Sequence, residues 1–168
     1  QIKTFGSNSD ANYSYKLINL TNKRSYFNFL IGKKILFKNL STNLLGEHNV
    51  QNLTAVLSII YDLGYKIKKS HILSFRGTKR RMNILGKLKK TIFIDDYAHH
   101  PTEIEKLINV ISLYKNKNIC LIIEPHRYSR LNDLYGEYLN VLKNVKNLII
   151  LKTYAVSYTH LRAHETVM

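Results

Sequence analysis

Residues 1–45 alternate loosely between apolar and polar positions. The alternation is clearest in three segments, YSYKLINL, SYFNFLIG and KKILFKNL. A period of two puts successive side chains on opposite faces of a sheet, so each segment is predicted to form a short strand. Polar turns separate the segments, which predicts an antiparallel arrangement.

The period then changes to that of a helix, which is predicted to begin near His48. Apolar residues recur every three or four positions, at Val50, Leu53, Leu57 and Ile60. Gly64 is a natural residue to end this helix, because glycine accepts the left-handed conformation found after many helices. A second short helix is predicted over HILSF, capped by Ser70 and ending before Gly77.

After Lys90, apolar runs alternate with helical patterns. The predicted strands cover residues 91–94, 119–123 and 148–151. The apolar positions of the two helical patterns are Ile104, Leu107, Ile108 and Ile111, then Leu131, Leu134, Tyr135, Tyr138 and Leu142. This β-α-β-α-β order is typical of a parallel, doubly wound α/β sheet.

The basic segment RGTKRRMN interrupts both patterns, so a domain boundary is predicted between residues 78 and 79. Residues 1–78 and 79–155 then belong to separate domains. The last segment, VSYTHLRAHETVM, has no apolar periodicity. We expect residues 156–168 to be a non-native tail without a role in function.

Composition narrows the possible functions. The chain has 168 residues, 45% of them hydrophobic, which is enough to bury a core, and no apolar run long enough to span a membrane. Its net charge of +15 invites a nucleic-acid interpretation, but the lysines are scattered and no aromatic platform accompanies them. A genome rich in A and T explains the abundance of Lys, Asn, Ile and Tyr. We expect neither nucleic acid nor membrane as a partner.

Cys120 is the single cysteine and lies in the apolar run ICLII. This setting predicts a buried, unreactive thiol, and one cysteine excludes a disulfide framework within the chain. The opening residues QIKTFGSNSD lack the pattern of a signal peptide. The single cysteine favours a reducing, cytoplasmic compartment.

A polar loop, DDYAHHPTE, follows the first strand of the predicted parallel sheet. Ligands of open α/β sheets bind at the carboxyl ends of the strands. Thr102 and Glu105 are predicted to form a capping box on the next helix, whose first N–H groups favour an anion. The neighbouring His99 and His100 could suggest zinc. However, adjacent side chains diverge and no further ligands follow at standard spacing, so no metal site is predicted.

A second polar loop, EPHRYSR, follows the next predicted strand. Pro125 would fix its turn, and Arg127 and Arg130 are three residues apart at the expected ligand edge. An ordinary surface loop is the alternative. Two polar loops at neighbouring strand ends favour a binding site.

Four segments carry a resemblance to a known family. GEHNVQNLTAV, GTKRR, DDYAHHPTE and PHRYSR occur in this order, and the chain resembles the Mur ligases over about residues 1–155. These enzymes form an amide bond with ATP and Mg²⁺, through an acyl phosphate on a sugar nucleotide. The resemblance implies the late part of a P-loop-type ATPase domain, followed by an incomplete Rossmann-like domain with a parallel sheet.

The resemblance also implies roles in ATP binding. Asn49 and Asn52 would contact adenine, although Asn49 could instead be an ordinary helix cap. Arg81 would reach the ATP phosphates, with a solvated charge as the alternative, and Asp96 would bind the ribose hydroxyls. No glycine-rich P-loop occurs in the chain. The P-loop and the Mg²⁺ ligands are therefore expected upstream, and no catalytic residue is assigned within this fragment.

Tyr97, His99, Arg127 and Arg130 are the residues that the resemblance places around the amino-acid substrate. The arginine pair favours the branch of the family that joins L-alanine to UDP-N-acetylmuramate. A related branch that joins a recycled tripeptide to the same sugar nucleotide remains an alternative. A basic polyanion-binding module without catalysis is the third possibility.

Overall fold

The computed structural model describes residues 2–114 and 118–154, and shows a mixed α/β protein. The chain divides into two compact units. The first unit comprises Gln1–Ala98 and Glu105–Lys117, and the second comprises His99–Ile104 and Asn118–Met168. The boundary expected between residues 78 and 79 stays a prediction, and the expected tail, residues 156–168, lies outside the described residues.

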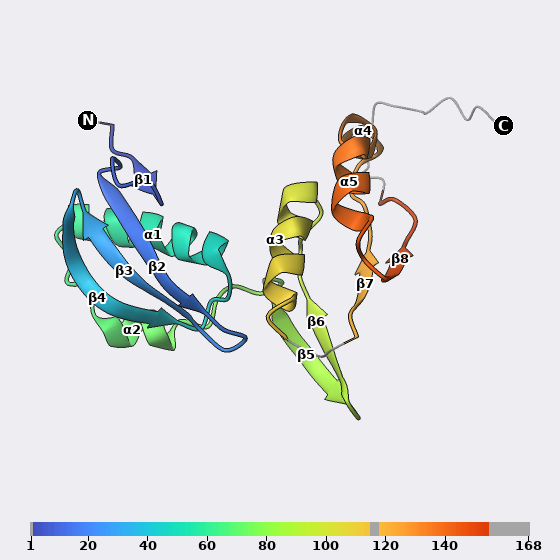
Figure 1. The fold of residues 1–168 in the computed structure, drawn as a ribbon, viewed down its shortest axis with the longest axis horizontal. Helices are drawn as coiled ribbons and strands as arrows, with labels where there is room; N and C mark the ends of the chain where they lie inside the picture. The colour runs from blue at the N-terminus through green and yellow to red at the C-terminus, as the bar shows by residue number, and fades with distance from the viewer. Residues whose placement is uncertain (1, 115–117, 155–168) are drawn as a thin grey trace. The chain divides into compact units, whose positions relative to one another are not determined.

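The first unit opens with a four-stranded sheet in the order β1-β2-β3-β4 (Figure 1). Its strands are β1 Phe5–Gly6, β2 Tyr13–Leu20, β3 Ser25–Ile31 and β4 Lys34–Thr42. The last three pair antiparallel, which confirms the prediction from alternation, whereas the two-residue β1 pairs parallel with β2.

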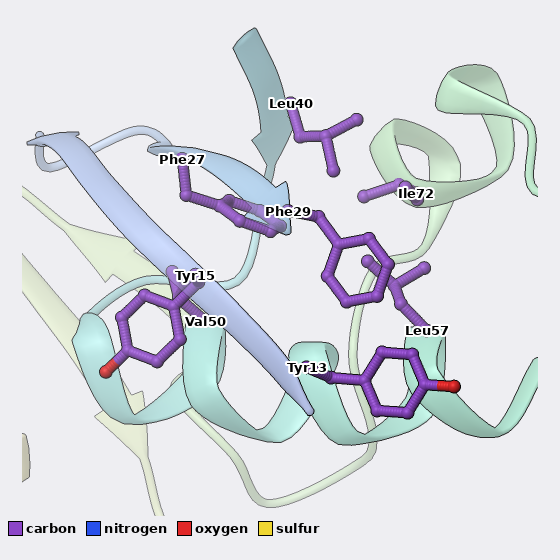
Figure 2. Close-up of a cluster of buried hydrophobic side chains, with 8 residues drawn as sticks. All are labelled: Tyr13, Tyr15, Phe27, Phe29, Leu40, Val50, Leu57 and Ile72. Atoms are coloured by element: carbon purple, nitrogen blue, oxygen red, sulfur yellow. The ribbon is translucent and has the colours of Figure 1, made fainter. Parts of the chain in front are cut away.

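One face of this sheet packs against the helices α1 Glu47–Asp62 and α2 Lys69–Ser74. Figure 2 shows the resulting core, in which alternate residues of β2 and β3 point toward the helices. The buried cluster consists of Tyr13, Tyr15, Phe27, Phe29, Leu40, Val50, Leu57 and Ile72. Removing this apolar surface from water is the main force that holds the sheet and the two helices together.

The ends of α1 and α2 differ in how well the sequence predicted them. Gly64, with φ +76°, follows α1 in a Schellman motif, as expected: its N–H donates to Tyr61 and the N–H of Tyr65 donates to Ile60. The capping role considered for Asn49 is wrong, because α1 begins at Glu47 with Gly46 as its N-cap. Ser70 is also not a cap, since it lies inside α2.

A hairpin follows in the first unit, formed by β5 Asn83–Leu88 and β6 Thr91–Asp95. β6 was predicted, but β5 was not. The turn between them consists of two lysines, and Lys89 has φ +53°. Such turns usually carry Asn-Gly or Asp-Gly, so the lysine pair gave no hairpin signal.

The second unit contains β7 Cys120–Ile123 and β8 Asn147–Ile150, which pair in parallel as predicted. Between them, α4 Tyr128–Asp133 and α5 Tyr135–Leu142 replace the single helix expected there. Leu134, with ψ 18°, interrupts the helical path. Helix α3, Pro101–Ile111, bears out the first helical pattern.

The parallel sheet is smaller than expected. Among the described residues β6 is paired with β5 and not with β7, so β7 and β8 form a two-stranded sheet. Cys120 is exposed, which corrects the prediction of a buried thiol. It shares the uncovered face of β7 with Ile122, whereas Leu121 and Ile123 are buried. None of the helices in the described ranges is both long and apolar enough to cross a bilayer.

Candidate functional site

Asp96 fastens the segment before β5 to the loop after β6. Its Oδ2 accepts the N–H of Met82 at 2.9 Å, and its Oδ1 accepts the N–H of Ala98 at 2.8 Å. Arg80 and Met82 both have positive φ, and the N–H of Tyr97 donates to the carbonyl of Arg80. Each carboxylate oxygen keeps a further lone pair, so Asp96 can shape the segment and still accept from a ligand.

Arg80, next to the predicted phosphate ligand Arg81, has partners at this loop. Its guanidinium lies 5.1 Å from the ring centre of Tyr97 and 3.9 Å from the carboxylate of Asp95. The Arg80 side chain is 64% exposed, so its ion pair with Asp95 adds little stability. Tyr97 is a predicted alanine-binding residue, and the Arg80 guanidinium stacks on its ring and holds it against the 80–82 segment.

His48 brings the start of α1 into the same electrostatic environment. Burial lowers the pKa of the His48 imidazole; the charge of Asp96 raises it, and those of Lys106 and Arg81 lower it. The segments GEHN, KRR and DDY therefore lie close enough within the first unit for Arg81 and Asp96 to act electrostatically on His48. This juxtaposition is what a shared nucleotide site requires.

The two predicted adenine contacts lie in the first turns of α1. The side-chain nitrogen of Asn49 donates to the carbonyl of Leu45 at 2.7 Å, and its side-chain oxygen can still accept a bond. Asn52 is exposed one turn later. Their spacing puts both amides on one side of the helix.

The start of α3 is capped differently from the prediction, which named Thr102 and Glu105. Helix α3 begins at Pro101, so the capping glutamate is Glu103. Its Oε2 accepts the N–H groups of His99 at 3.1 Å and His100 at 3.2 Å, and the N–H of Thr102 donates to Nδ1 of His100. The anion expected at this helix start is thus supplied by the chain itself.

Three aromatic rings form a row in the second unit. The ring centres of His99 and His126 are 5.3 Å apart, and those of His126 and Tyr154 are 5.4 Å apart. Backbone bonds continue the β7–β8 pairing to this point: the N–H of Tyr154 donates to Pro125, and the N–H of Arg127 donates to Tyr154. The parallel ladder therefore sets the position of the row.

Tyr138 connects α5 to the same place. Its hydroxyl donates to the carbonyl oxygen of His99, and its side chain is almost fully buried. Burial raises the pKa of Tyr138; the positive charge of Arg130 lowers it, and the negative charge of Glu103 raises it further. Arg130 and Glu103 thus both act on Tyr138 electrostatically.

The predicted alanine-binding residues are divided between the units. His99, Arg127 and Arg130 belong to the second unit and Tyr97 to the first. Arg127 is exposed and is the N-cap of α4, with φ +67°, while Arg130 is partly buried within α4.

Sequence reasoning missed Glu103, His126 and Tyr138. A signal existed for Glu103, which stands three residues after the N-cap His100, the spacing of a capping box. Tyr138 was assigned to the core from its helical spacing. Within residues 2–114 and 118–154, no three His, Cys, Asp or Glu side chains gather in a way that could hold a metal ion.

Comparison with known proteins adds a family. The family described as "Mur ligase, glutamate ligase domain" matches residues 80–165. UDP-N-acetylmuramate–L-alanine ligase of Pelagibacter ubique is 36% identical over 158 residues, covering 90% of this chain and 34% of the relative. The enzyme of the same name from Aquifex aeolicus is 34% identical, covering 94% of this chain and 35% of the relative.

Among solved structures, UDP-N-acetylmuramate–alanine ligase from Thermotoga maritima superposes with a TM-score of 0.76 and is 27% identical. The match covers 90% of this chain and 34% of that one. The chain therefore spans about a third of the length of the relatives that it matches.

Proposed function

This chain belongs to the Mur ligase family, and from that premise we propose that it is part of a ligase that joins L-alanine to UDP-N-acetylmuramate at the expense of ATP. One observation carries the proposal: relatives named for this reaction match at 34–36% identity across nine-tenths of the chain. The whole protein would act in the cytoplasm, in building the peptidoglycan precursor, on small-molecule substrates.

In the proposed reaction, the carboxylate of the sugar nucleotide attacks the γ-phosphorus of ATP. An acyl phosphate forms and ADP leaves. The amine of L-alanine then attacks the acyl carbon, phosphate leaves, and the amine loses a proton. Chemistry of this kind depends on positioning and on charge stabilisation more than on a covalent nucleophile.

We assign the nucleotide to the first unit. Asn49 and Asn52 would contact adenine, Asp96 the ribose hydroxyls and Arg81 the phosphates. The electrostatic proximity of His48, Arg81 and Asp96 supports this assignment. The Mg²⁺ ligands are proposed to lie in the protein outside these 168 residues.

We assign the amino acid to Tyr97, His99, Arg127 and Arg130. L-Alanine offers a methyl group, an amine and a carboxylate, and the amine must stay available to attack. Orientation must therefore come mainly from the carboxylate, which guanidinium groups bind through charge-assisted bonds. We also propose a domain boundary near residue 79; the family match, which begins at residue 80, supports it.

The test is phosphate release by the full-length protein that contains this chain. Release that requires ATP, UDP-N-acetylmuramate and L-alanine together supports the proposal. Release with a cell-wall tripeptide in place of L-alanine would assign the protein to the recycling branch. Salt-sensitive binding to DNA or heparin, with no ATP-dependent reaction, would instead favour the polyanion-binding module.

A further inference from the structure

His99 is held at three different points within the second unit. Its N–H donates to Glu103, its carbonyl oxygen accepts from Tyr138, and its ring lies against His126. These contacts come from the first turn of α3, from α5 and from the loop after β7. A side chain on a connecting loop normally has more freedom than this.

The carboxylate of Glu103 binds the backbone of His99 and also lies beside its imidazole ring. The same Oε2 that accepts the N–H groups of His99 and His100 lies 3.5 Å from Nδ1 of the His99 imidazole. A carboxylate near Nδ1 favours the form of the ring that carries a proton on that nitrogen. Glu103 therefore influences both where the ring points and which nitrogen faces away.

The contact with Tyr138 fixes the other side of the peptide. Tyr138 is 4% exposed, so its hydroxyl is held by the packing of α5. The nearby charge of Arg130 acts on the same hydroxyl. Tyr138 thus joins His99, proposed to line the alanine pocket, to α5, the helix that follows α4 with its proposed carboxylate ligand Arg130.

The row of rings limits rotation of the imidazole. His126 covers one side of the His99 ring, and Tyr154 backs His126 in turn. Because the β7–β8 ladder sets this row, the orientation of His99 depends on the sheet rather than on the loop alone. Such preorganisation is what a binding residue needs to contribute to orientation without a large entropic cost.

We infer that Glu103, Tyr138 and His126 are positioning residues that hold His99 in one orientation toward the incoming amino acid. The inference rests on the proposed function for the role of His99. Its structural half, that these three side chains fix His99, can be tested independently of any activity.

The kinetic test uses Tyr138→Phe and Glu103→Gln in the full-length protein. Tyr138→Phe removes one oxygen and keeps the buried ring. Each variant should raise KM for L-alanine about threefold to tenfold, the scale of one lost hydrogen bond. KM for ATP should change less than about twofold, because the nucleotide residues are untouched. Tyr135→Phe and Glu105→Gln, exposed positions on the same helices, are the matched controls.

The second readout is the NMR spectrum of the His99 imidazole in the 168-residue chain. Both variants should shift or broaden the His99 ring signals, and the two control variants should leave them in place. The ring signals of His71, on α2 in the first unit, provide an internal reference.

The outcomes separate the two proposals. Wild-type protein without L-alanine-dependent turnover would overturn the proposed function, whereas the His99 signals would still decide whether the side chains position the ring. Unchanged His99 signals in both variants would overturn the inference. Equal rises in KM for L-alanine and ATP would also overturn it, because they would indicate a general structural role.

Discussion

At the scale of single residues, Gly46 shows how closely the start of α1 is packed. Its φ of +90° suits only glycine, and a Cβ there would lie 2.5 Å from Cγ2 of Val110 and 2.9 Å from Cε1 of His48. Gly46→Ala should therefore lower the free energy of unfolding by about 2 kcal/mol or more. Urea unfolding measures this change.

Gly136→Ala is the matched control for this substitution. Gly136 lies in α5 with nothing within 4 Å of an added Cβ. Alanine should stabilise a helical position of this kind by about 0.5–1 kcal/mol. Equal effects of the two substitutions would show that the conformation and contacts of Gly46 are not special.

His48 makes a prediction about pH. Burial lowers the pKa of its imidazole below the ordinary value of 6.5, so the unfolded chain binds more protons near that pH. Stability from the neutral ring is complete above about pH 6.5 and is lost as the pH falls through 6.5 toward the folded pKa. Urea unfolding from pH 7.5 to 5 should show this loss, and His48→Gln should reduce it. An identical pH dependence in both proteins would contradict the account.

Arg127 and Arg130 carry the prediction about specificity. In the full-length protein, replacing either by Ala should cost about 2–4 kcal/mol of transition-state stabilisation. The loss should appear mainly as a higher KM for L-alanine, with KM for ATP changed much less. Lysine should rescue poorly, because a point charge cannot reproduce the guanidinium fork.

Arg24→Ala, at an exposed turn of the first sheet, is the control for these steady-state measurements. It should leave both constants within about twofold, since exposed substitutions away from special features have small effects. A fall in ATP affinity with L-alanine affinity unchanged would show that the arginine loop belongs to the nucleotide.

At the scale of elements, the sequence predicted those strands and helices that the spacing of apolar residues indicates, and the helix end that a glycine marks. Strands β2, β3 and β4, helix α1 and its end at Gly64 follow from local pattern. The β5–β6 hairpin did not, because its turn is Lys89–Lys90 and because β5 contains Asn83 and Gly86. The break at Leu134 carries no local signal either, since leucine favours helix.

The residues of the candidate site also divide into those that the sequence indicated and those that it did not. Asp96 and His99 could be found because both follow an apolar strand in a recognisable motif. Glu103 could have been found from its capping-box spacing to His100, whereas Tyr138 could not, because its importance depends on the backbone carbonyl that it reaches across the fold. The binding roles of all eight predicted site residues stay predictions: Asn49, Asn52, Arg81, Asp96, Tyr97, His99, Arg127 and Arg130.

Helix α1 presents an apolar stripe to solvent. Val56, Ile59 and Leu63 are between 50% and 65% exposed and lie on the side that also bears Asn49 and Asn52. We propose that a part of the whole protein outside this chain covers the stripe, since the relatives are about three times as long. Ile59→Glu should then destabilise the full-length protein by about 1–3 kcal/mol, because burial leaves the carboxylate unpaired.

Thermal unfolding of two proteins tests this prediction. In the 168-residue chain, Ile59→Glu should change stability by no more than about 0.5 kcal/mol. Gln51→Glu, at an exposed position of the same helix, is the control and should be nearly neutral in both proteins. Equal effects of Ile59→Glu in the chain and in the full-length protein would contradict the proposed cover.

At the scale of the whole molecule, uncovered apolar surface recurs in both units. Ile84, Leu85 and Leu88 of β5 are exposed in the first unit, as are Ile122 and Ile150 of the β7–β8 sheet in the second. A chain that spans a third of its relatives is expected to leave such faces open. We therefore expect the 168-residue chain alone to have no ligase activity.

The central claim is that this chain belongs to a ligase for L-alanine and UDP-N-acetylmuramate. The most direct measurement incubates the full-length protein with ATP, Mg²⁺, UDP-N-acetylmuramate and equal amounts of L-alanine and cell-wall tripeptide, and identifies the product by mass spectrometry. The account predicts UDP-N-acetylmuramoyl-L-alanine as the main product, formed only when ATP is present. The tripeptide adduct as main product, or no adduct at all, would contradict it.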